Sequence, residues 1–375
     1  DDEGFRMTGA ASHTSTFRHA NPYTTAAVVE LNNADFVTLD NLLLTGGTRG
    51  LWARNVSTNL TANNIHSFGN TQEGIRVDTG SSILSFDGVA ATGNSGAGLF
   101  VDGLVGAISG GSFSGNAGHG MDLRDIGNAR IVSSEIAQNT GRDVRGVVIN
   151  NQVAGTMAVY GDPDVSLGLG NRVHDNATYG IYATGRVEVA GNTVYGHVGA
   201  NNYGIAATNG ASIRRNVLHD NTSGLYSNAR APVAENRSYH NQDAGLVLDS
   251  TTPATGNVVY SNAVGVRTLL SYDGNLTNNV VYANTNQGVL VDGSGYYGGV
   301  RELVNNTIYQ TTGDAIRVQG PAKNVHVRNN VLWVEGGAAL SVASESQVGF
   351  ASDYNVFHTP GAGYVAFWQG GVRPT

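Results

Sequence analysis

The chain has 375 residues, of which 52 are glycine and none is cysteine, and only 13% of its residues are charged. Its net charge is −8 and Lys323 is its single lysine, so no basic stripe of the kind that binds nucleic acid is visible. Disulfides and thiolate metal sites are excluded by the missing cysteine, and no apolar run approaches the length of a membrane span.

A short pattern recurs at intervals of about two dozen residues, a period typical of solenoid proteins. It begins with Asn, continues with an apolar and then an aromatic or His residue, and ends in Gly followed by a second apolar run. Weaker early copies lead into Gly50, Gly74, Gly98, Gly120 and Gly146. Clear copies begin at Asn171, Asn192, Asn216, Asn236, Asn257 and Asn279. Short alternating β-branched segments bounded by Gly and Asn predict strands.

Two short strands joined by a corner cannot bury an apolar face alone, but stacked coils can. Each strand then pairs with its equivalent one coil further on, about 4.8 Å away. We therefore predict an all-β fold, a single parallel β-helix (solenoid) of about a dozen coils with Val, Ile and Leu inside. Residues 1–27 are expected to form an irregular cover or partial coil, and residues 28–375 the β-helix, with a loop insertion near residues 150–170.

Glycine takes corners with positive φ without a steric penalty, and asparagine tolerates them. Stacked asparagine side chains can also hydrogen-bond from coil to coil as a ladder. Two such ladders are predicted. The first contains Asn171, Asn192, Asn216, Asn236, Asn257, Asn279, Asn306 and Asn330, and the second contains Asn176, Asn221, Asn241, Asn262 and Asn284.

In these repeats the chain resembles right-handed parallel β-helix proteins of the pectate-lyase-like superfamily, over roughly residues 28–357. The resemblance implies a right-handed coil of a kind common in bacterial secreted polysaccharide-active proteins and surface proteins. It does not imply one function, because the same scaffold hosts lyases, epimerases, hydrolases and inert spacers.

The segment from Tyr160 to Asp164, followed by His174, is similar to the catalytic region of mannuronan C5-epimerases. That family uses a Tyr, an Asp, a His and a second Asp. Tyr160 and Asp162 match the first two, whereas Asp164 and Thr184 stand where the His and the second Asp are expected. The resemblance makes Tyr160, Asp162, Asp164 and His174 candidate catalytic residues with an incomplete acid/base pair. The alternative is a turn built on Asp-Pro.

Acidic residues gather after the corner glycines of the early repeats, at Asp78, Asp102, Asp122 and Asp125. Asp78 and Asp102 are expected on adjacent coils, about 5 Å apart. Such carboxylates suit three roles: strand-ending turns, a Ca²⁺ site or a glycosidase pair. Calcium is the only cofactor that the sequence suggests.

Aromatic and histidine side chains recur three residues after the first Asn of each repeat and are expected on one outer face. After His174 the candidate ligand-binding residues of this column are Tyr195, His219, Tyr239, Tyr260, Tyr282, Tyr309 and Trp333. Such a wall suits sugar rings; the alternative is a stack that only supports itself. A second aromatic candidate is the pair Tyr296 and Tyr297 in a Gly-rich loop.

These patterns favour a secreted or cell-surface bacterial scaffold or adhesion module that is non-catalytic and contacts a polysaccharide. Because the chain begins at Asp1 without a signal peptide, we expect a processed chain or a piece of a longer one with flanking domains. The alternative is a polysaccharide-processing enzyme: a lyase, a C5-epimerase or a glycoside hydrolase. The sequence leaves open whether the protein is an enzyme.

Overall fold

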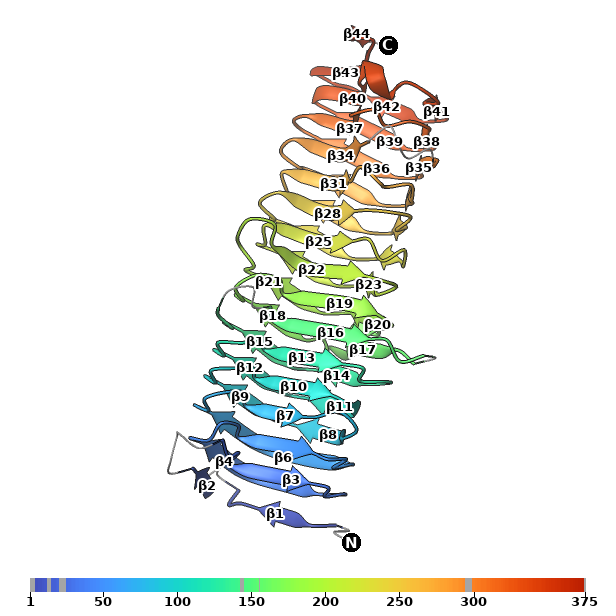
Figure 1. Ribbon diagram of the computed structural model, residues 1–375. Helices are drawn as coiled ribbons and strands as arrows, with labels where there is room; N and C mark the ends of the chain where they lie inside the picture. The colour runs from blue at the N-terminus through green and yellow to red at the C-terminus, as the bar shows by residue number, and fades with distance from the viewer. Residues whose placement is uncertain are drawn as a thin grey trace. The chain divides into compact units, whose positions relative to one another are not determined.

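The computed structural model describes residues 4–11, 15–19, 25–141, 145–154, 156–293 and 299–373. The chain contains two compact units, unit 1 (Asp1–His197) and unit 2 (Val198–Thr375). Each unit is a stack of parallel β-coils, which confirms the predicted all-β solenoid (Figure 1). Within the described ranges the helical segments are two 3₁₀ turns, η1 (Val165–Leu167) and η2 (Ser344–Ser346).

The coils of unit 1 build two sheets. The front sheet contains β3 (Val29–Asn32), β5 (Leu51–Arg54), β7 (Ile75–Val77), β10 (Leu99–Asp102), β13 (Met121–Arg124), β16 (Val147–Asn151) and β19 (Ile181–Gly185). The back sheet contains β1 (Arg6–Thr8), β2 (Ser15–Arg18), β4 (Thr38–Thr45), β6 (Leu60–Phe68), β8 (Ser82–Asp87), β9 (Ala90–Thr92), β11 (Leu104–Ser109), β12 (Ser112–Ser114), β14 (Arg130–Val132), β15 (Glu135–Ala137), β17 (Ala158–Gly161), β18 (Arg172–His174), β20 (Val187–Ala190) and β21 (Thr193–Tyr195). β1 and β2 both pair in parallel with β4.

Unit 2 repeats this plan. Its front sheet contains β22 (Tyr203–Thr208), β25 (Ser223–Ser227), β28 (Ala244–Leu248), β31 (Val264–Thr268), β34 (Gln287–Asp292), β37 (Asp314–Gln319), β40 (Gly336–Val342) and β43 (Ala362–Trp368), with β44 (Gly371–Arg373) antiparallel to β43. Its back sheet contains β23 (Ser212–Arg214), β24 (Val217–His219), β26 (Val233–Ala234), β27 (Arg237–Tyr239), β29 (Ala254–Thr255), β30 (Val258–Tyr260), β32 (Asn275–Thr277), β33 (Val280–Tyr282), β35 (Arg301–Val304), β36 (Thr307–Gln310), β38 (Val325–Arg328), β39 (Val331–Val334), β41 (Ala351–Asp353) and β42 (Val356–His358).

A typical coil has three strands rather than the two that we predicted. The coil formed by β10, β11 and β12 shows why there is a third strand. Gly110, at φ 61°, bends the back-sheet segment and divides it into β11 and β12. Alternate residues of each strand point inward. Ile75, Leu99 and Met121 pair from coil to coil and are fully buried, and each such side chain contributes roughly 1.5–3 kcal/mol of burial free energy.

Both predicted asparagine ladders are present. In unit 2 the first ladder runs from Asn216 to Asn355, and at Asn257 the side-chain Nδ2 donates to Asn279 Oδ1 at 2.9 Å. The second ladder of unit 1 extends beyond the predicted residues. It contains Asn70, Asn94, Asn116, Asn139 and Asn176, joined at 2.8–3.0 Å. Each Oδ1 also accepts a backbone N–H, so these buried amides are paired on both sides.

The corners differ from the prediction in one respect. The ladder asparagines do not adopt positive φ; the residue just before each often does, as at Gly115 (65°), Asp220 (55°) and Ser261 (55°). The corner glycines, such as Gly74 and Gly98, do not adopt positive φ either.

The corner glycines are explained by close backbone contact between coils. A Cβ added to Gly74 would lie 2.8 Å from the carbonyl oxygen of Gly98, and one added to Gly98 would lie 2.8 Å from that of Gly120. Both distances are shorter than real Cβ contacts. Glycine is therefore required here for its missing side chain rather than for its backbone freedom.

Candidate glycan-contact surface

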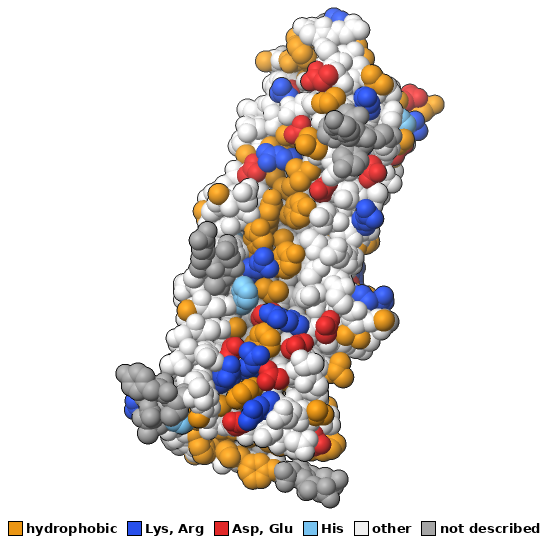
Figure 2. Space-filling view, in the orientation of Figure 1, with side chains coloured by type: hydrophobic (Ala, Val, Ile, Leu, Met, Phe, Trp, Pro, Cys, Tyr) orange, Lys and Arg blue, Asp and Glu red, His pale blue; other side chains and the backbone are white. Residues whose placement is uncertain are grey.

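Outward side chains of the unit 1 front sheet are mainly arginines, acids and aromatic rings. Strand pairing aligns Glu30, Trp52, Arg76, Phe100 and Asp122 in one column, one residue per coil. The residues two positions further along form the next column, which contains Asn32, Arg54, Asp78, Asp102 and Arg124. Figure 2 shows basic and acidic side chains gathered over the front strands of unit 1. We call the two columns, with Arg49, Glu73, His119 and Arg145 beside them, the charged front face.

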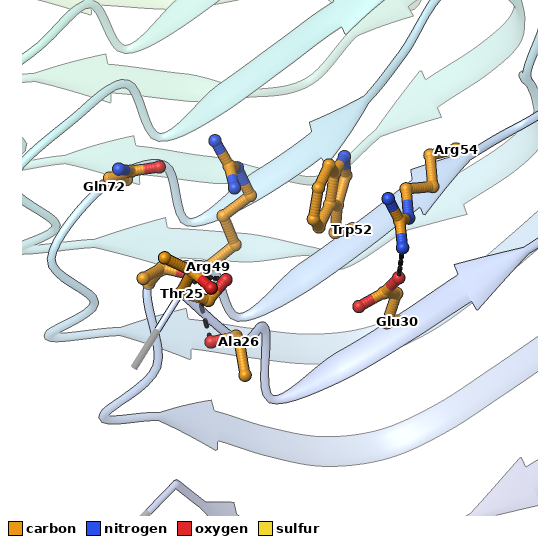
Figure 3. A pocket seen from close by; sticks show the side chains of 8 residues that line it. Thr25, Ala26, Glu30, Arg49, Trp52, Arg54 and Gln72 are labelled. Carbon is orange, nitrogen blue, oxygen red and sulfur yellow. Dashed lines mark hydrogen bonds and ion pairs between the residues drawn. The ribbon is translucent and has the colours of Figure 1, made fainter. Parts of the chain in front are cut away.

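Trp52 lies between two guanidinium groups (Figure 3). The Cζ atoms of Arg49 and Arg54 lie 4.6 and 4.5 Å from the centroid of the indole, within cation–π distance. The indole Nε1 donates a 2.7 Å hydrogen bond to Asp78. The ring is therefore held by two cations and one carboxylate.

The arginines of this face are paired with acids. Arg49 donates to Glu73 at 2.8 Å, Arg76 bridges Glu73 at 2.9 Å and Asp78 at 2.6 Å, and Arg54 contacts Glu30. Burial opposes the charge of Arg76, but hydrogen bonds and attraction from Asp78 and Glu73 raise its pKa overall. The formal charges around Trp52 therefore cancel.

Phe100 repeats the arrangement two coils further on. The Cζ atoms of Arg76 and Arg124 lie 4.4 and 4.8 Å from its ring centroid. Arg124 in turn donates to the nearly buried Asp122 at 2.8 Å. Aromatic rings, guanidinium groups and carboxylates thus lie beside one another on successive coils of the face.

His119 lies at the same face. Its Nδ1 accepts a 3.1 Å hydrogen bond from the backbone N–H of Arg145. Burial, together with the charges of Arg145 and Arg124, lowers the pKa of His119, although Asp122 acts in the opposite direction. The imidazole is therefore neutral near pH 7, beside a guanidinium that packs 4.1 Å from the Tyr182 ring centroid.

The predicted acidic cluster is divided among separate partners. Asp102 accepts from Thr79 Oγ1 at 2.6 Å, Asp122 from Arg124, and Asp125 from the backbone N–H of Gln152 at 3.1 Å. Asp78 and Asp102 do occupy successive coils, as predicted. On the following coil, however, strand register aligns Asp102 with Arg124 rather than with another acid. Among the described residues, no three His, Asp or Glu side chains are grouped so that they could hold a metal ion.

The epimerase-like segment does not form an exposed site. Tyr160 is fully buried on β17, in register with the core residues Ile131 and Val189, and burial raises its pKa well above the usual value. The prediction that Tyr160 is catalytic is therefore wrong for this structure, because its hydroxyl cannot contact a polymer. Asp162 is 1% exposed, and Asp164 serves as the N-cap of η1.

His174 lies elsewhere, on the outer side of β18. Its Nδ1 is 2.9 Å from Asp175 and its Nε2 is 3.1 Å from Glu135. Its ring stacks on Tyr195 with 4.7 Å between centroids and 2° between planes. The buried Tyr160 and the outward His174 do not face one another, so they do not form a shared catalytic site.

The aromatic column exists, but it is stacked rather than laid out as a wall. In unit 2, Tyr239 and Tyr260 are 5.0 Å apart at 6°, Tyr260 and Tyr282 are 4.8 Å apart at 6°, and His219 stacks on Tyr239 at 5.1 Å. Ring faces therefore cover one another and edges point outward. The rings within the stack cover one another's faces, which agrees with the alternative of a stack that supports itself.

Tyr309 and Trp333 depart from the stack. They meet at 72°, and Trp333 is 43% exposed. The other aromatic candidates, Tyr296 and Tyr297, lie outside the described residues.

Of the residues on this face, sequence analysis singled out the acids Asp78, Asp102 and Asp122, and it missed Trp52 and Phe100. A positional signal identifies this column: from Trp52 onward each member lies two residues after a corner glycine, as in Gly50–Trp52 and Gly98–Phe100. The signal was overlooked because these residue types vary from coil to coil, whereas the asparagines and glycines do not.

The family is shown by a model described as "Right handed beta helix region", which matches residues 27–194 and 169–332. These matches cover more than half of the chain, which therefore belongs to the right-handed β-helix family. A comparison with curated proteins finds no match.

Several solved structures are similar to this chain. A mutant of the periplasmic alginate epimerase AlgG is 15% identical, with a TM-score of 0.47 over 90% of this chain and 79% of that one. The A-module of the Azotobacter vinelandii mannuronan C-5 epimerase AlgE6 is 16% identical, with a TM-score of 0.34 over 91% and 88%. PfbA, a surface adhesin of Streptococcus pneumoniae, is 10% identical, with a TM-score of 0.33 over 94% and 85%. Over the described part of this chain, no helix has the length and apolar character needed to cross a bilayer.

Proposed function

We propose that this protein is a secreted or surface-exposed, non-catalytic β-helix that contacts a glycan through the charged front face of unit 1. The alternation of Trp52, Arg76, Phe100 and Asp122 along one sheet face supports this proposal. Glycans present hydroxyl groups that need both donors and acceptors at fixed spacing. Arginine and carboxylate side chains held by rings and by one another supply both on a rigid support.

The charge balance of the face favours a neutral or weakly charged glycan. Arg49, Arg54, Arg76 and Arg124 are each paired with a carboxylate. A strongly anionic polymer would have to displace those acids, and their negative charges would repel it. A hydroxyl-rich ligand can instead donate to the acids and accept from the arginines without breaking the pairs.

The non-catalytic part of the proposal follows from the candidate catalytic residues. Tyr160 is in the core, Asp162 is buried, and Thr184 occupies the place of the family's second Asp. The residues carried over from the epimerase resemblance thus supply no exposed acid/base pair.

A second candidate function, a polysaccharide-processing enzyme, is favoured by His119. The Nδ1 atom of the neutral imidazole accepts the backbone N–H of Arg145, so Nε2 carries the proton and donates beside a carboxylate-binding cation; the ring would act as a general base once a substrate displaces the hydrogen bond to Nδ1. An unsaturated product measured by ultraviolet absorbance with alginate or pectin, and lost in His119→Gln, would establish this function in place of the proposed one.

Binding experiments test the leading proposal. The purified chain should be retained on at least one immobilised neutral glucan, mannan or galactan, and the double variant Phe100→Ala/Arg124→Ala should lower the affinity about tenfold. Arg267→Ala is the matched control, because Arg267 forms the same kind of pair with Asp243 on the front sheet of unit 2. Equal losses in both variants, or no retention on any glycan, would contradict the proposal.

A further inference from the structure

A depression of about 460 Å³ opens beside Trp52 at the first coils of unit 1 (Figure 3). This volume lies within the range of roughly 300–1,000 Å³ that is usual for small-molecule sites. It is lined by Thr25, Ala26, Glu30, Thr48, Arg49, Trp52, Arg54 and Gln72. Because the surface is hollowed here, a ligand can be surrounded rather than only touched.

The floor of the depression is fixed by its own hydrogen bonds. Thr48 is 8% exposed, and its Oγ1 lies 3.1 and 3.0 Å from the backbone oxygens of Thr25 and Ala26. Trp52 is held by Arg49, Arg54 and Asp78. A ligand would therefore meet a preformed surface, which lowers the entropic cost of binding.

Some hydrogen-bonding capacity in the depression is unused. Arg54 Nε is buried and has no hydrogen-bond partner among the residues that the structure describes. Within the same residues, Arg49 hydrogen-bonds only through its Nε, to Glu73, which leaves its two terminal nitrogens available. The side-chain amide of Gln72, which is exposed, has no partner in the described ranges. Buried donors without a partner are costly, and a ligand oxygen that reaches Arg54 Nε when the guanidinium shifts would remove that cost.

The charges of the depression select among ligands. Arg49 and Arg54 are balanced by Glu73 and Glu30, so the depression has no net charge to attract an anion. Guanidinium groups also cover Trp52, so the ring supports the arginines rather than the ligand. Planar donors next to planar acceptors fit vicinal hydroxyl groups, each of which accepts from an arginine and donates to an acid or amide.

We infer that this depression is a saccharide-binding subsite that takes a neutral hexose unit of the bound glycan and reads its vicinal hydroxyls through Arg49, Arg54, Glu30 and Gln72. The inference rests on the proposed glycan-contact function and adds the position and the ligand class. A uronate carboxylate that binds Arg49 or Arg54 would compete with Glu73 or Glu30 for the same guanidinium, which opposes its binding.

The indole of Trp52 provides a direct readout. The chain has three tryptophans, Trp52, Trp333 and Trp368. In the variant Trp333→Phe/Trp368→Phe, Trp52 is the only tryptophan, so excitation selective for indole reports on it alone, and a sugar that moves Arg49 or Arg54 changes its fluorescence. Titration with neutral glucose, mannose and galactose oligosaccharides should give a saturable change with at least one of them, whereas glucuronate should bind about tenfold more weakly or not at all.

Two further substitutions, each added to the Trp333→Phe/Trp368→Phe variant, test whether the sugar binds in the depression. Arg54→Ala should weaken binding about tenfold and Gln72→Ala a few-fold, since charge-assisted hydrogen bonds are stronger than neutral ones. Gln72 is exposed and its amide has no partner in the described chain, so its variant keeps the fold even if Arg54→Ala does not. Arg267→Ala in unit 2 is again the control and should leave the titration unchanged.

The outcomes separate the two proposals. Glycan retention without a Trp52 response, and with unchanged affinity in Gln72→Ala, overturns the subsite but leaves the proposed function standing. No retention and no response overturn both. Tighter binding of glucuronate than of neutral sugars overturns the assignment of ligand class.

Discussion

Two residues after each corner glycine, unit 1 places Trp52, Arg76 and Phe100, whereas unit 2 places Tyr226, Val247, Arg267 and Leu290 at the same position. The aliphatic side chains of this unit 2 column are sealed by their own packing, since Val247 is 3% and Leu290 8% exposed, and Arg267 is the charged member of the column. Figure 2 shows a hydrophobic stripe over the front strands of unit 2. The same kind of coil can therefore present polar and charged side chains to solvent, as in unit 1, or mainly packed apolar side chains, as in unit 2. Both are possible because outward positions are free of the constraints that fix the core.

The largest expected difference between the front faces of the two units is the loss of stability when an acidic residue is introduced. Val247→Asp should lower the free energy of unfolding by roughly 3 kcal/mol, because a carboxylate would replace the isopropyl group of a residue that is 3% exposed and packed in an apolar cluster with Ala244, Val264 and Leu290. Val148→Asp, at the half-buried equivalent position in unit 1, should cost less than about 1 kcal/mol. Chemical denaturation measures both, and similar losses would show that the two faces do not differ in this way.

The asparagine ladders, unlike the front faces, should contribute equally to the stability of both units. Asn116→Ala in unit 1 and Asn257→Ala in unit 2 should each destabilise by roughly 1–3 kcal/mol, since each leaves buried amide and backbone groups without partners. Thermal melting with calorimetry measures the loss. Asn286→Ala, at an exposed position outside the ladders, serves as the control and should be neutral; a neutral Asn116→Ala would argue against the role of the ladder.

A smaller effect is expected at Trp52. Trp52→Phe keeps a ring between the two guanidiniums but removes the N–H that donates to Asp78, and should cost about 1 kcal/mol. Trp52→Ala should cost more, because both arginines lose their ring contact. If urea denaturation finds the two variants equal, the guanidiniums do not depend on the ring.

The smallest effect is a pH dependence confined to unit 1. Burial keeps the pKa of His119 below its ordinary value of 6.5, so the unfolded chain binds the proton more readily than the folded one. Stability is therefore full above pH 6.5 and is lost as the pH falls below that value through the folded-state pKa. His119→Gln should flatten this part of the stability profile measured by hydrogen exchange. His240→Gln, at an exposed position in unit 2, should leave the profile as it is.

Sequence reasoning succeeded where residue type is dictated by the repeat itself. Asn236, Asn257 and Asn279 recur because each must bond the next, and alternating Val, Ile and Leu recur because each faces the interior. These constraints act on every coil, so they are visible as a period in one sequence.

The candidate site was predicted less well, because outward side chains obey no period. Tyr160 matched a catalytic motif by local order alone, but whether its strand position faces inward depends on pairing with Ile131 and Val189. The tyrosine column was placed on the correct face, yet the orientation of its rings depends on rotamers that a spacing rule does not contain. The guanidinium contacts of Trp52 depend in the same way on side-chain geometry across neighbouring coils.

The close contacts of the corner glycines also constrain how this protein can evolve. Because Gly74 faces Gly98 and Gly98 faces Gly120, no member of the row can acquire a side chain while its neighbour stays in place. Duplicating or deleting a complete coil, by contrast, always leaves glycine facing glycine. We therefore expect natural relatives to differ in length by whole coils, as nearest-neighbour repeat proteins do, and the glycine row to stay unbroken while the outward faces diverge freely.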